Sequence, residues 1–328
     1  MKRSGEEWAI VLAAGEGSRL QALTTHAGVA TPKQFCSLRG GRSLLGDAIA
    51  RAAQVVAWDR IVVTVAAEHR AFWREELESL PAENAVVQPR NRGTAPGILF
   101  PLLTILERDP EARVVVLPSD HFVEKEYVMA VSLRLALEVI ERDEERVVLL
   151  GITPDAPETG YGWITSKRTH GALEKAASFV EKPPAERARE LMQEGALWNS
   201  FLFAARGSAL TALYEQELSR LYGRLKDALR APWTKRELLI EAVYESLESS
   251  DFSRDLLQRC EERLWLYRVP ACGWTDLGTP ERVASCVAAL QERVASALPR
   301  ATPRLAARFD LASALERWNA GAALAQPA

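Results

Sequence analysis

Short apolar runs alternate with longer amphipathic segments in the first half of the chain, and this alternation constrains the fold most. The runs are strand-length and rich in valine, isoleucine and leucine: Trp8 to Ala14, Ile61 to Ala66, Val114 to Leu117 and Val147 to Ile152. Helical spacing marks the segments between them: Ser43 to Val56, Ala95 to Glu107 and Tyr127 to Glu141. Continuous apolar strands between helices are typical of a parallel sheet covered on both faces. We therefore expect a doubly wound, mostly parallel α/β sheet.

The second half is less regular, and its expected elements are shorter. Strands are expected at Trp163 to Ser166, Ser178 to Glu181, Trp198 to Ala204 and Leu264 to Val269. Helices are expected at Pro184 to Glu194, Ser208 to Leu221, Lys235 to Leu247 and Pro280 to Leu298. We expect one domain over residues 1–298. Residues 299–328 then form a proline-flanked linker and a helical appendage, Leu305 to Leu324, whose removal should leave substrate affinities nearly unchanged.

Charge and composition exclude several partners. The net charge is -3, so the chain lacks the excess of positive charge that is typical of nucleic-acid-binding proteins. The longest apolar runs, such as Ile61 to Ala67, are too short to span a bilayer, so no membrane partner is expected. The four cysteines show no Cys-x-x-Cys spacing and are interpreted as free thiols in a reducing, cytoplasmic compartment. Self-association into a homo-oligomer stays open.

A glycine-rich turn follows the first expected strand, with the sequence Leu12-Ala13-Ala14-Gly15-Glu16-Gly17-Ser18-Arg19-Leu20. Glycines let backbone amides approach a phosphate, and arginine adds a matching charge. The segment lacks the Gly-Lys-Ser/Thr ending of a P-loop. It also has Leu20 where a dinucleotide fingerprint needs its third glycine, which disfavours a dehydrogenase. A simple strand-to-helix turn with a surface arginine is the alternative.

Two further segments carry charges suited to a triphosphate. In Thr31-Pro32-Lys33-Gln34-Phe35, proline fixes the backbone just before a cation. In Pro118-Ser119-Asp120-His121, a carboxylate follows a core strand, where ligands of open α/β sheets bind and where Mg²⁺ can be held against phosphates. Taken singly, Lys33 could be a surface lysine and Asp120 a helix cap.

Five other clusters have glycine, polar and aromatic residues that singly indicate only loops or caps. They are Gln88 to Ala95, Thr159-Gly160-Tyr161-Gly162-Trp163, Val180-Glu181-Lys182-Pro183, Trp198-Asn199-Ser200 and Trp274-Thr275-Asp276-Leu277-Gly278. In Glu181-Lys182 an extended backbone would make the adjacent side chains diverge. The two side chains would then reach different sides of a pocket.

Together, and in this order, the segments resemble mannose-1-phosphate guanylyltransferases and the wider sugar-1-phosphate nucleotidyltransferase family over roughly residues 8 to 285. The resemblance implies a GT-A-like, Rossmann-like fold. It also implies an enzyme that joins a nucleoside triphosphate, most simply GTP, to a sugar 1-phosphate such as mannose 1-phosphate. The products would be a nucleotide sugar such as GDP-mannose and pyrophosphate, with Mg²⁺ as cofactor.

The same resemblance implies roles for particular residues. Arg19 and Lys33 would hold the triphosphate, Asp120 and Asp276 the Mg²⁺, and Lys182 the sugar phosphate. Gly160, Glu181 and Asn199 would hold sugar hydroxyls. The nucleotide would lie against the glycine-rich turn and a base-contacting group: Leu12, Ala13, Ala14, Gly15, Gly17, Ser18, Gln88, Gly93 and Thr94.

Three departures from the family pattern bear on specificity. Ser18 replaces the usual threonine, Arg92-Gly93-Thr94 replaces the usual Arg-Asn-Thr, and Phe201 stands where the family generally has glycine. The base and the sugar are therefore open, and a manno-heptose or glucose phosphate is an alternative substrate. A non-catalytic nucleotide-sugar sensor on the same fold is the alternative from another class, although all five charged residues assigned to chemistry are present.

Overall fold

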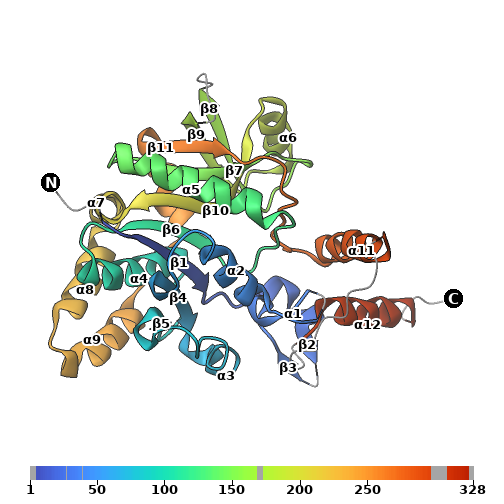
Figure 1. Cartoon of the computed structure of the whole chain (residues 1–328), viewed down its shortest axis with the longest axis horizontal. Helices are drawn as coiled ribbons and strands as arrows, with labels where there is room; N and C mark the ends of the chain where they lie inside the picture. The colour runs from blue at the N-terminus through green and yellow to red at the C-terminus, as the bar shows by residue number, and fades with distance from the viewer. Residues whose placement is uncertain (1–4, 27, 39, 168–172, 297–308, 325–328) are drawn as a thin grey trace.

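One nine-stranded sheet organises the chain in the computed structural model, which describes residues 5–26, 28–38, 40–167, 173–296 and 309–324. The strand order is β5-β4-β1-β6-β10-β7-β11-β9-β8 (Figure 1). The first four strands in this order are all parallel. Their bounds are β1 Glu7–Ala13, β4 Ile61–Ala66, β5 Ala85–Gln88 and β6 Arg113–Pro118. The parallel part of the sheet is therefore built from the first half of the chain, as the sequence predicts.

The rest of the sheet is mixed. β10 lies antiparallel between β6 and β7, β11 runs parallel to β7, and β9 and β8 form an antiparallel edge. The bounds are β7 Val147–Ile152, β8 Gly162–Lys167, β9 Leu173–Glu181, β10 Leu197–Arg206 and β11 Leu264–Arg268. The α/β class is confirmed, and the antiparallel insertion of β10 creates a switch point beside β6.

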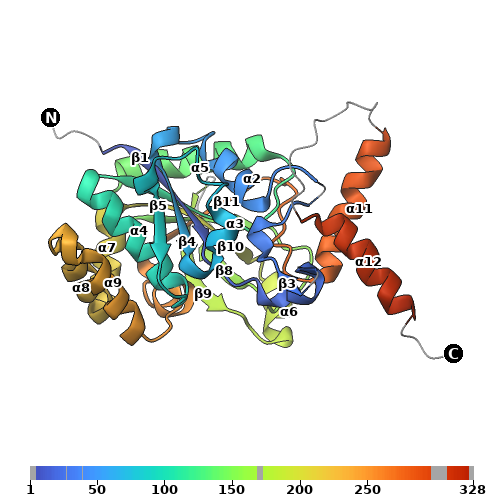
Figure 2. The ribbon, with the colours of Figure 1, turned by 90° about the horizontal axis from the view of Figure 1, so that it is seen from below.

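Side chains that alternate along the strands pack into two hydrophobic cores, one on each face of the sheet. In β1, Trp8 and Ile10 enter the first core, whereas Ala9 and Val11 enter the second. Helices α4 and α7–α9 cover the first face, and α2 and α5 cover the second (Figure 2). Their bounds are α2 Leu44–Ala52, α4 Thr94–Arg108, α5 Glu126–Arg142, α7 Gly207–Glu217, α8 Ser219–Arg230 and α9 Trp233–Ser246.

Helices α11 (Pro280–Ser296) and α12 (Leu311–Leu324) lie together at one end of the molecule (Figures 1 and 2). A third apolar cluster joins them to α1 (Gln21–Thr24) through Leu23, Val283 and Leu311, and it also contains Leu20. Ser37 also donates its backbone N–H to Phe309 at 2.7 Å and accepts one from Leu311 at 2.8 Å. The C-terminal helix therefore packs on the glycine-rich segment, while the predicted linker Pro299 to Pro303 lies outside the described residues.

Several predicted boundaries differ from the structure. The sequence predicts one helix over Ser208 to Leu221, but the chain breaks at Leu218 and continues as α8. Strand β5 is missed because it has only four residues. The remaining elements are short: α3 Arg70–Trp73, α6 Ala185–Gln193, α10 Phe252–Asp255, β2 Thr25–His26 and β3 Val29–Ala30. Within the described ranges, no helix has the length and apolar character needed to cross a bilayer.

Candidate active site

A cavity of about 300 Å³ opens at the carboxyl ends of β1 and β6, beside the switch to β10. Open α/β sheets bind ligands at such a point. Eleven of the predicted site residues line it: Leu12, Gly15, Gly17, Arg19, Thr94, Asp120, Gly160, Glu181, Lys182, Asn199 and Asp276. The other six predicted residues are not among the residues that line it: Ala13, Ala14, Ser18, Lys33, Gln88 and Gly93. The fold thus brings together motifs that are far apart in the sequence.

The glycine-rich turn is held against the Lys33 segment. Gly17 has φ 64°, and a Cβ there would lie 2.9 Å from the backbone nitrogen of Lys33, so only glycine fits. The Gln34 side chain donates to the carbonyls of Ala13 at 3.1 Å and Gly15 at 2.7 Å. Gln34, to which the sequence assigns no role, therefore fastens the turn to the segment that carries Lys33.

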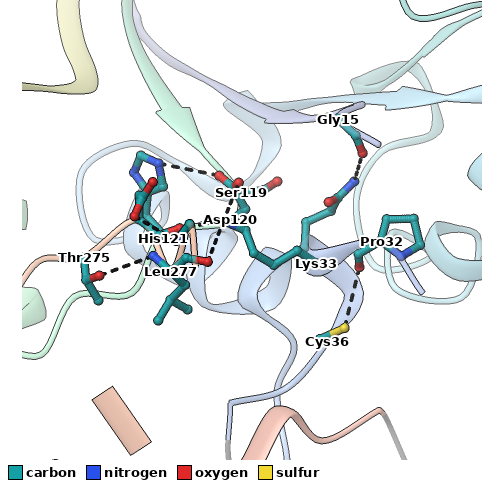
Figure 3. A network of polar contacts seen from close by, with 12 residues as sticks. Gly15, Pro32, Lys33, Cys36, Ser119, Asp120, His121, Thr275 and Leu277 are labelled. Atoms are coloured by element: carbon teal, nitrogen blue, oxygen red, sulfur yellow. Dashed lines mark hydrogen bonds and ion pairs between the residues drawn. The ribbon is translucent and has the colours of Figure 1, made fainter. Parts of the chain in front are cut away.

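Lys33 is buried between the carboxylate of Asp120 and the backbone of Asp276 and Leu277 (Figure 3). Its Nζ lies 2.9 Å from Asp120 Oδ2 and donates to the carbonyl oxygens of Asp276 at 2.5 Å and Leu277 at 3.5 Å. Burial raises the pKa of Asp120, but Lys33 and His121 outweigh it and lower the pKa to about 2. Asp120 is therefore an anion at neutral pH.

His121 lies against the same carboxylate. Its Nδ1 accepts a hydrogen bond from Trp274 Nε1 at 3.3 Å, and its Nε2 is 3.6 Å from Asp120 Oδ1. Burial lowers the pKa of His121 to about 4, against the opposing pull of Asp120. The imidazole is therefore neutral at pH 7.

This pKa predicts an acid sensitivity. Between pH 6.5 and 4 the unfolded chain binds more protons at position 121 than the folded chain, so stability falls as pH falls through that window. The loss from this group reaches about 3 kcal/mol at pH 4. Chemical denaturation of His121→Gln and the parent at pH 7 and pH 4 should show a smaller acid loss in the variant. Equal losses would contradict a neutral His121.

One end of the cavity is lined by residues of β9 and β10 and by Lys182, which directly follows β9. Lys182 Nζ and Glu181 Oε1 form an ion pair of 3.1 Å. The expectation that these side chains diverge is wrong, because Lys182 has φ 46° and leaves the extended conformation. Burial raises the pKa of Glu181, and Lys182 opposes that shift. Both residues nevertheless line the cavity.

Phe201 occupies a left-handed backbone position, with φ 61°. Its N–H donates to Asn199 Oδ1 at 3.1 Å, and β10 shifts register between Asn199 and Phe203. A left-handed conformation costs a residue with a Cβ roughly 1–2 kcal/mol, whereas glycine adopts it freely. The ring lines the cavity and packs edge-on against Phe252, with centroids 6.1 Å apart. The backbone geometry thus fits the family glycine while the side chain narrows the cavity.

We expect Phe201→Gly to be more stable than Phe201→Ala by about 1 kcal/mol. Both substitutions remove the ring, and only alanine retains the left-handed cost. Urea denaturation of the two variants measures the difference directly. An alanine variant at least as stable as the glycine variant would show that position 201 is not left-handed.

Gly93 and Thr94 begin α4 under a loop that the sequence did not single out. Gly93 has φ 89°, and a Cβ there would lie 2.3 Å from the carbonyl oxygen of Ser250. Thr94 Oγ1 donates to Asp251 Oδ2 at 3.2 Å. Gln88 is buried, and its Oε1 has no hydrogen-bond partner among the described residues. Because the backbone of Ser250 approaches so closely, position 93 requires glycine.

Sequence reasoning missed other residues of the cavity wall. Asp251 and Ser253 line it, and Ser253 Oγ accepts from Asn199 Nδ2 at 3.5 Å. Asp251 also caps α10 through an Oδ1 contact to the N–H of Arg254 at 2.9 Å. A Ser-Ser-Asp segment in the sequence indicates a helix cap and no more, so nothing in it marks a ligand site.

An α/β sheet with cationic side chains and carboxylates around a switch-point cavity is typical of enzymes that bind phosphate-containing ligands. The nucleotidyl transferase family model matches residues 8–293. The xanthan biosynthesis protein XanB of Xanthomonas campestris pv. campestris (strain B100) is 31% identical over 280 residues, covering 82% of this chain and 57% of XanB. The mannose-1-phosphate guanylyltransferase of Escherichia coli K12 is 30% identical over 291 residues, covering 82% of this chain and 57% of that protein.

Among solved structures, a Thermus thermophilus protein described as a mannose-1-phosphate geranyltransferase matches with a TM-score of 0.71 and 28% identity. The match covers 85% of this chain and 79% of that protein. The chain therefore belongs to the nucleotidyl transferase family. It spans little more than half the length of the curated relatives it matches.

Proposed function

We propose that this chain transfers a nucleotidyl group from GTP to mannose 1-phosphate. A sugar-phosphate oxygen would form a new bond to the α-phosphorus while the α–β phosphoanhydride bond breaks and pyrophosphate leaves. The supporting observation is that Arg19, Asp120, Lys182, Asn199 and Asp276, from five separate segments, line one cavity. A phosphate monoester is already a nucleophile at neutral pH, so the site must mainly bring two polyanions together.

The nucleotide half is proposed to lie over the glycine-rich turn. Leu12, Gly15 and Gly17 would contact it, with Arg19 directed to the triphosphate. The base would approach Thr94 and Gln88, whose buried Oε1 needs an N–H donor. Guanine would supply such donors through N1–H and N2–H at its Watson–Crick edge. Because the other bases also carry an N–H donor there, the preference for GTP rests on the likeness to mannose-1-phosphate guanylyltransferases.

Mg²⁺ fits the residues present. No group of three or more His, Cys, Asp or Glu side chains in the described part of the chain forms a self-sufficient metal site. Mg²⁺, however, is usually held by one or two carboxylates together with substrate phosphates. Asp120 and Asp276 would hold it, and it would supply charge neutralisation at the reacting phosphates. Lys33 would then turn from Asp120 to a phosphate oxygen.

The sugar 1-phosphate is proposed to bind at the other end of the cavity. Lys182 would hold its phosphate, and Gly160, Glu181 and Asn199 its hydroxyls. A manno-heptose or glucose phosphate is the alternative substrate. We also propose a cytoplasmic setting, because Cys36, Cys260, Cys272 and Cys286 are all free thiols.

A matrix of four nucleotides against several sugar 1-phosphates, with Mg²⁺, tests the assignment. We expect pyrophosphate release to be highest with GTP and mannose 1-phosphate. Higher release with another pair would support the nucleotidyltransferase activity but assign it different substrates. No release with any pair would refute the proposal and favour a sensor.

Lys182→Ala should separate the two substrate halves. Losing a charged phosphate contact should raise the KM for the sugar 1-phosphate roughly ten- to a hundredfold and lower turnover, with little change in GTP affinity measured without sugar. Steady-state kinetics and calorimetry give these values, and Lys235→Ala on the exposed face of α9 is the control. Loss of GTP binding with normal sugar-phosphate kinetics would reverse the two subsites.

A further inference from the structure

The carboxylate of Asp276 is held through a single oxygen. Its Oδ1 accepts from Tyr161 OH at 2.6 Å, from Gly278 N at 2.8 Å and from Arg282 Nη1 at 2.6 Å. A carboxylate oxygen has about two lone-pair sites, so three converging donors fill Oδ1. Oδ2 lies next to Gly278, where a Cβ would approach it to 2.4 Å. The side chain is thus fixed in one orientation.

Arg282 reaches this carboxylate from helix α11, outside the segments that resemble the family motifs. Its guanidinium also contacts Tyr161 OH and forms an ion pair with Glu158. It lies over the Tyr161 ring, 4.5 Å from the centroid. Because three separate groups hold one planar guanidinium, its position is specified by the fold.

Tyr161 is held equally firmly. Its ring packs against Trp198 and Trp274, with centroids 4.9 and 5.5 Å away. Tyr161 belongs to both the walls of the candidate active site and those of a second cavity of about 360 Å³, which Arg282 and Glu158 also line. The Tyr161–Arg282 pair therefore connects α11 with the carboxylate at the edge of the active site.

Building this arrangement has an electrostatic cost. Burial, and next the nearby Arg19, lower the pKa of Arg282. The guanidinium of Arg19, in the wall of the candidate active site, is thus close enough to repel that of Arg282, in the wall of the second cavity. Asp155 opposes this shift, and Asp276 and Glu158 form ion pairs with the guanidinium.

We infer that Tyr161 and Arg282 are positioning residues that fill Oδ1 of Asp276 and so present Oδ2 to the cation of the proposed reaction. This inference rests on the proposed function only for the presence of a divalent cation. It requires neither a particular base nor a particular sugar. Partners that orient a metal ligand typically change metal affinity ten- to a hundredfold when they are removed.

The test is Mn²⁺ binding in the presence of pyrophosphate, followed by electron paramagnetic resonance. Tyr161→Phe removes one donor and keeps the ring, and Arg282→Met removes the guanidinium. We expect each to weaken Mn²⁺ binding about ten- to a hundredfold. The Mn²⁺ affinity of Arg282→Lys should lie between those of Arg282→Met and the parent. An ammonium keeps the positive charge but lacks the planar set of N–H donors of a guanidinium. Arg187→Met, whose ion pairs lie within the α6 region, is the control and should bind Mn²⁺ like the parent.

A merely structural role would lower the melting temperature and leave Mn²⁺ affinity unchanged. Parent-like affinity in folded Tyr161→Phe and Arg282→Lys would therefore overturn the inference, as would a parent chain that binds no Mn²⁺ with pyrophosphate. Failure of the proposed function has a different signature. The parent would then release no pyrophosphate with any nucleotide and sugar, whatever the Mn²⁺ measurements show.

Discussion

Asp120→Asn and Asp276→Asn are each expected to lower turnover by roughly a hundredfold or more, because a metal ion contributes several kcal/mol of charge stabilisation. An amide is a poorer ligand for Mg²⁺ and has no charge. The two variants should differ in stability. Asp120→Asn leaves the buried ammonium of Lys33 without its carboxylate, whereas Asp276→Asn weakens the contact to Arg282. Pyrophosphate release at saturating Mg²⁺ and thermal melting measure the two effects.

The control for this pair is Asp143→Asn, which changes an ion pair with Arg146 away from the cavity. It should keep parental turnover. Near-normal turnover in Asp120→Asn or Asp276→Asn would remove that residue from the metal site. Equal loss in all three variants would point to a general effect of lost negative charge.

Deleting α12 should have the second large effect, contrary to the expectation drawn from the sequence. Leu311 is fully buried, and Ala314 and Leu315 nearly so, in the cluster that contains Leu20 and Leu277. Those two residues directly follow Arg19 and Asp276. We therefore expect a chain ending at Pro299 to lose several kcal/mol of stability and to bind GTP more weakly.

A single substitution tests the same packing with less disturbance. Leu311→Ala should cost about 2–5 kcal/mol, because it leaves a cavity in a packed cluster. Trp318, on the same helix and 43% exposed, gives the control, and Trp318→Ala should change stability by less than about 0.5 kcal/mol. Urea denaturation measures the free energy of unfolding of both variants and so distinguishes them. A truncated chain with parental stability and GTP affinity would show that α12 is the independent appendage first expected.

The sequence was most informative where backbone geometry dictates residue type. The apolar runs of β1, β4, β6 and β7 predict their places in the sheet because strands buried on both faces need continuous aliphatic residues. Gly17 was recognisable because a close backbone approach requires glycine. Because the carboxyl ends of parallel strands lie at one edge of the sheet, the motifs that follow β1 and β6 meet in one cavity.

Contacts between distant segments were not predictable from local patterns. Nothing near Lys33 shows that its ammonium is buried against Asp120 and the carbonyl of Asp276. The sequence predicts that the side chains of Glu181 and Lys182 diverge, as adjacent side chains do in an extended strand. The prediction is wrong because Lys182 has a positive φ, which depends on tertiary contacts and not on local sequence. Arg282 was missed for the same reason, since helix periodicity describes its own helix and not the carboxylate it reaches.

The most direct test of the proposed reaction is phosphorus NMR of the chain with GTP, mannose 1-phosphate and Mg²⁺. We predict that signals of pyrophosphate and of a nucleotide-linked sugar diphosphate appear together and in equal amounts. They should be absent when the sugar phosphate or Mg²⁺ is omitted. Hydrolysis of GTP without a sugar diphosphate, or no change with any nucleotide and sugar phosphate tried, would contradict the account.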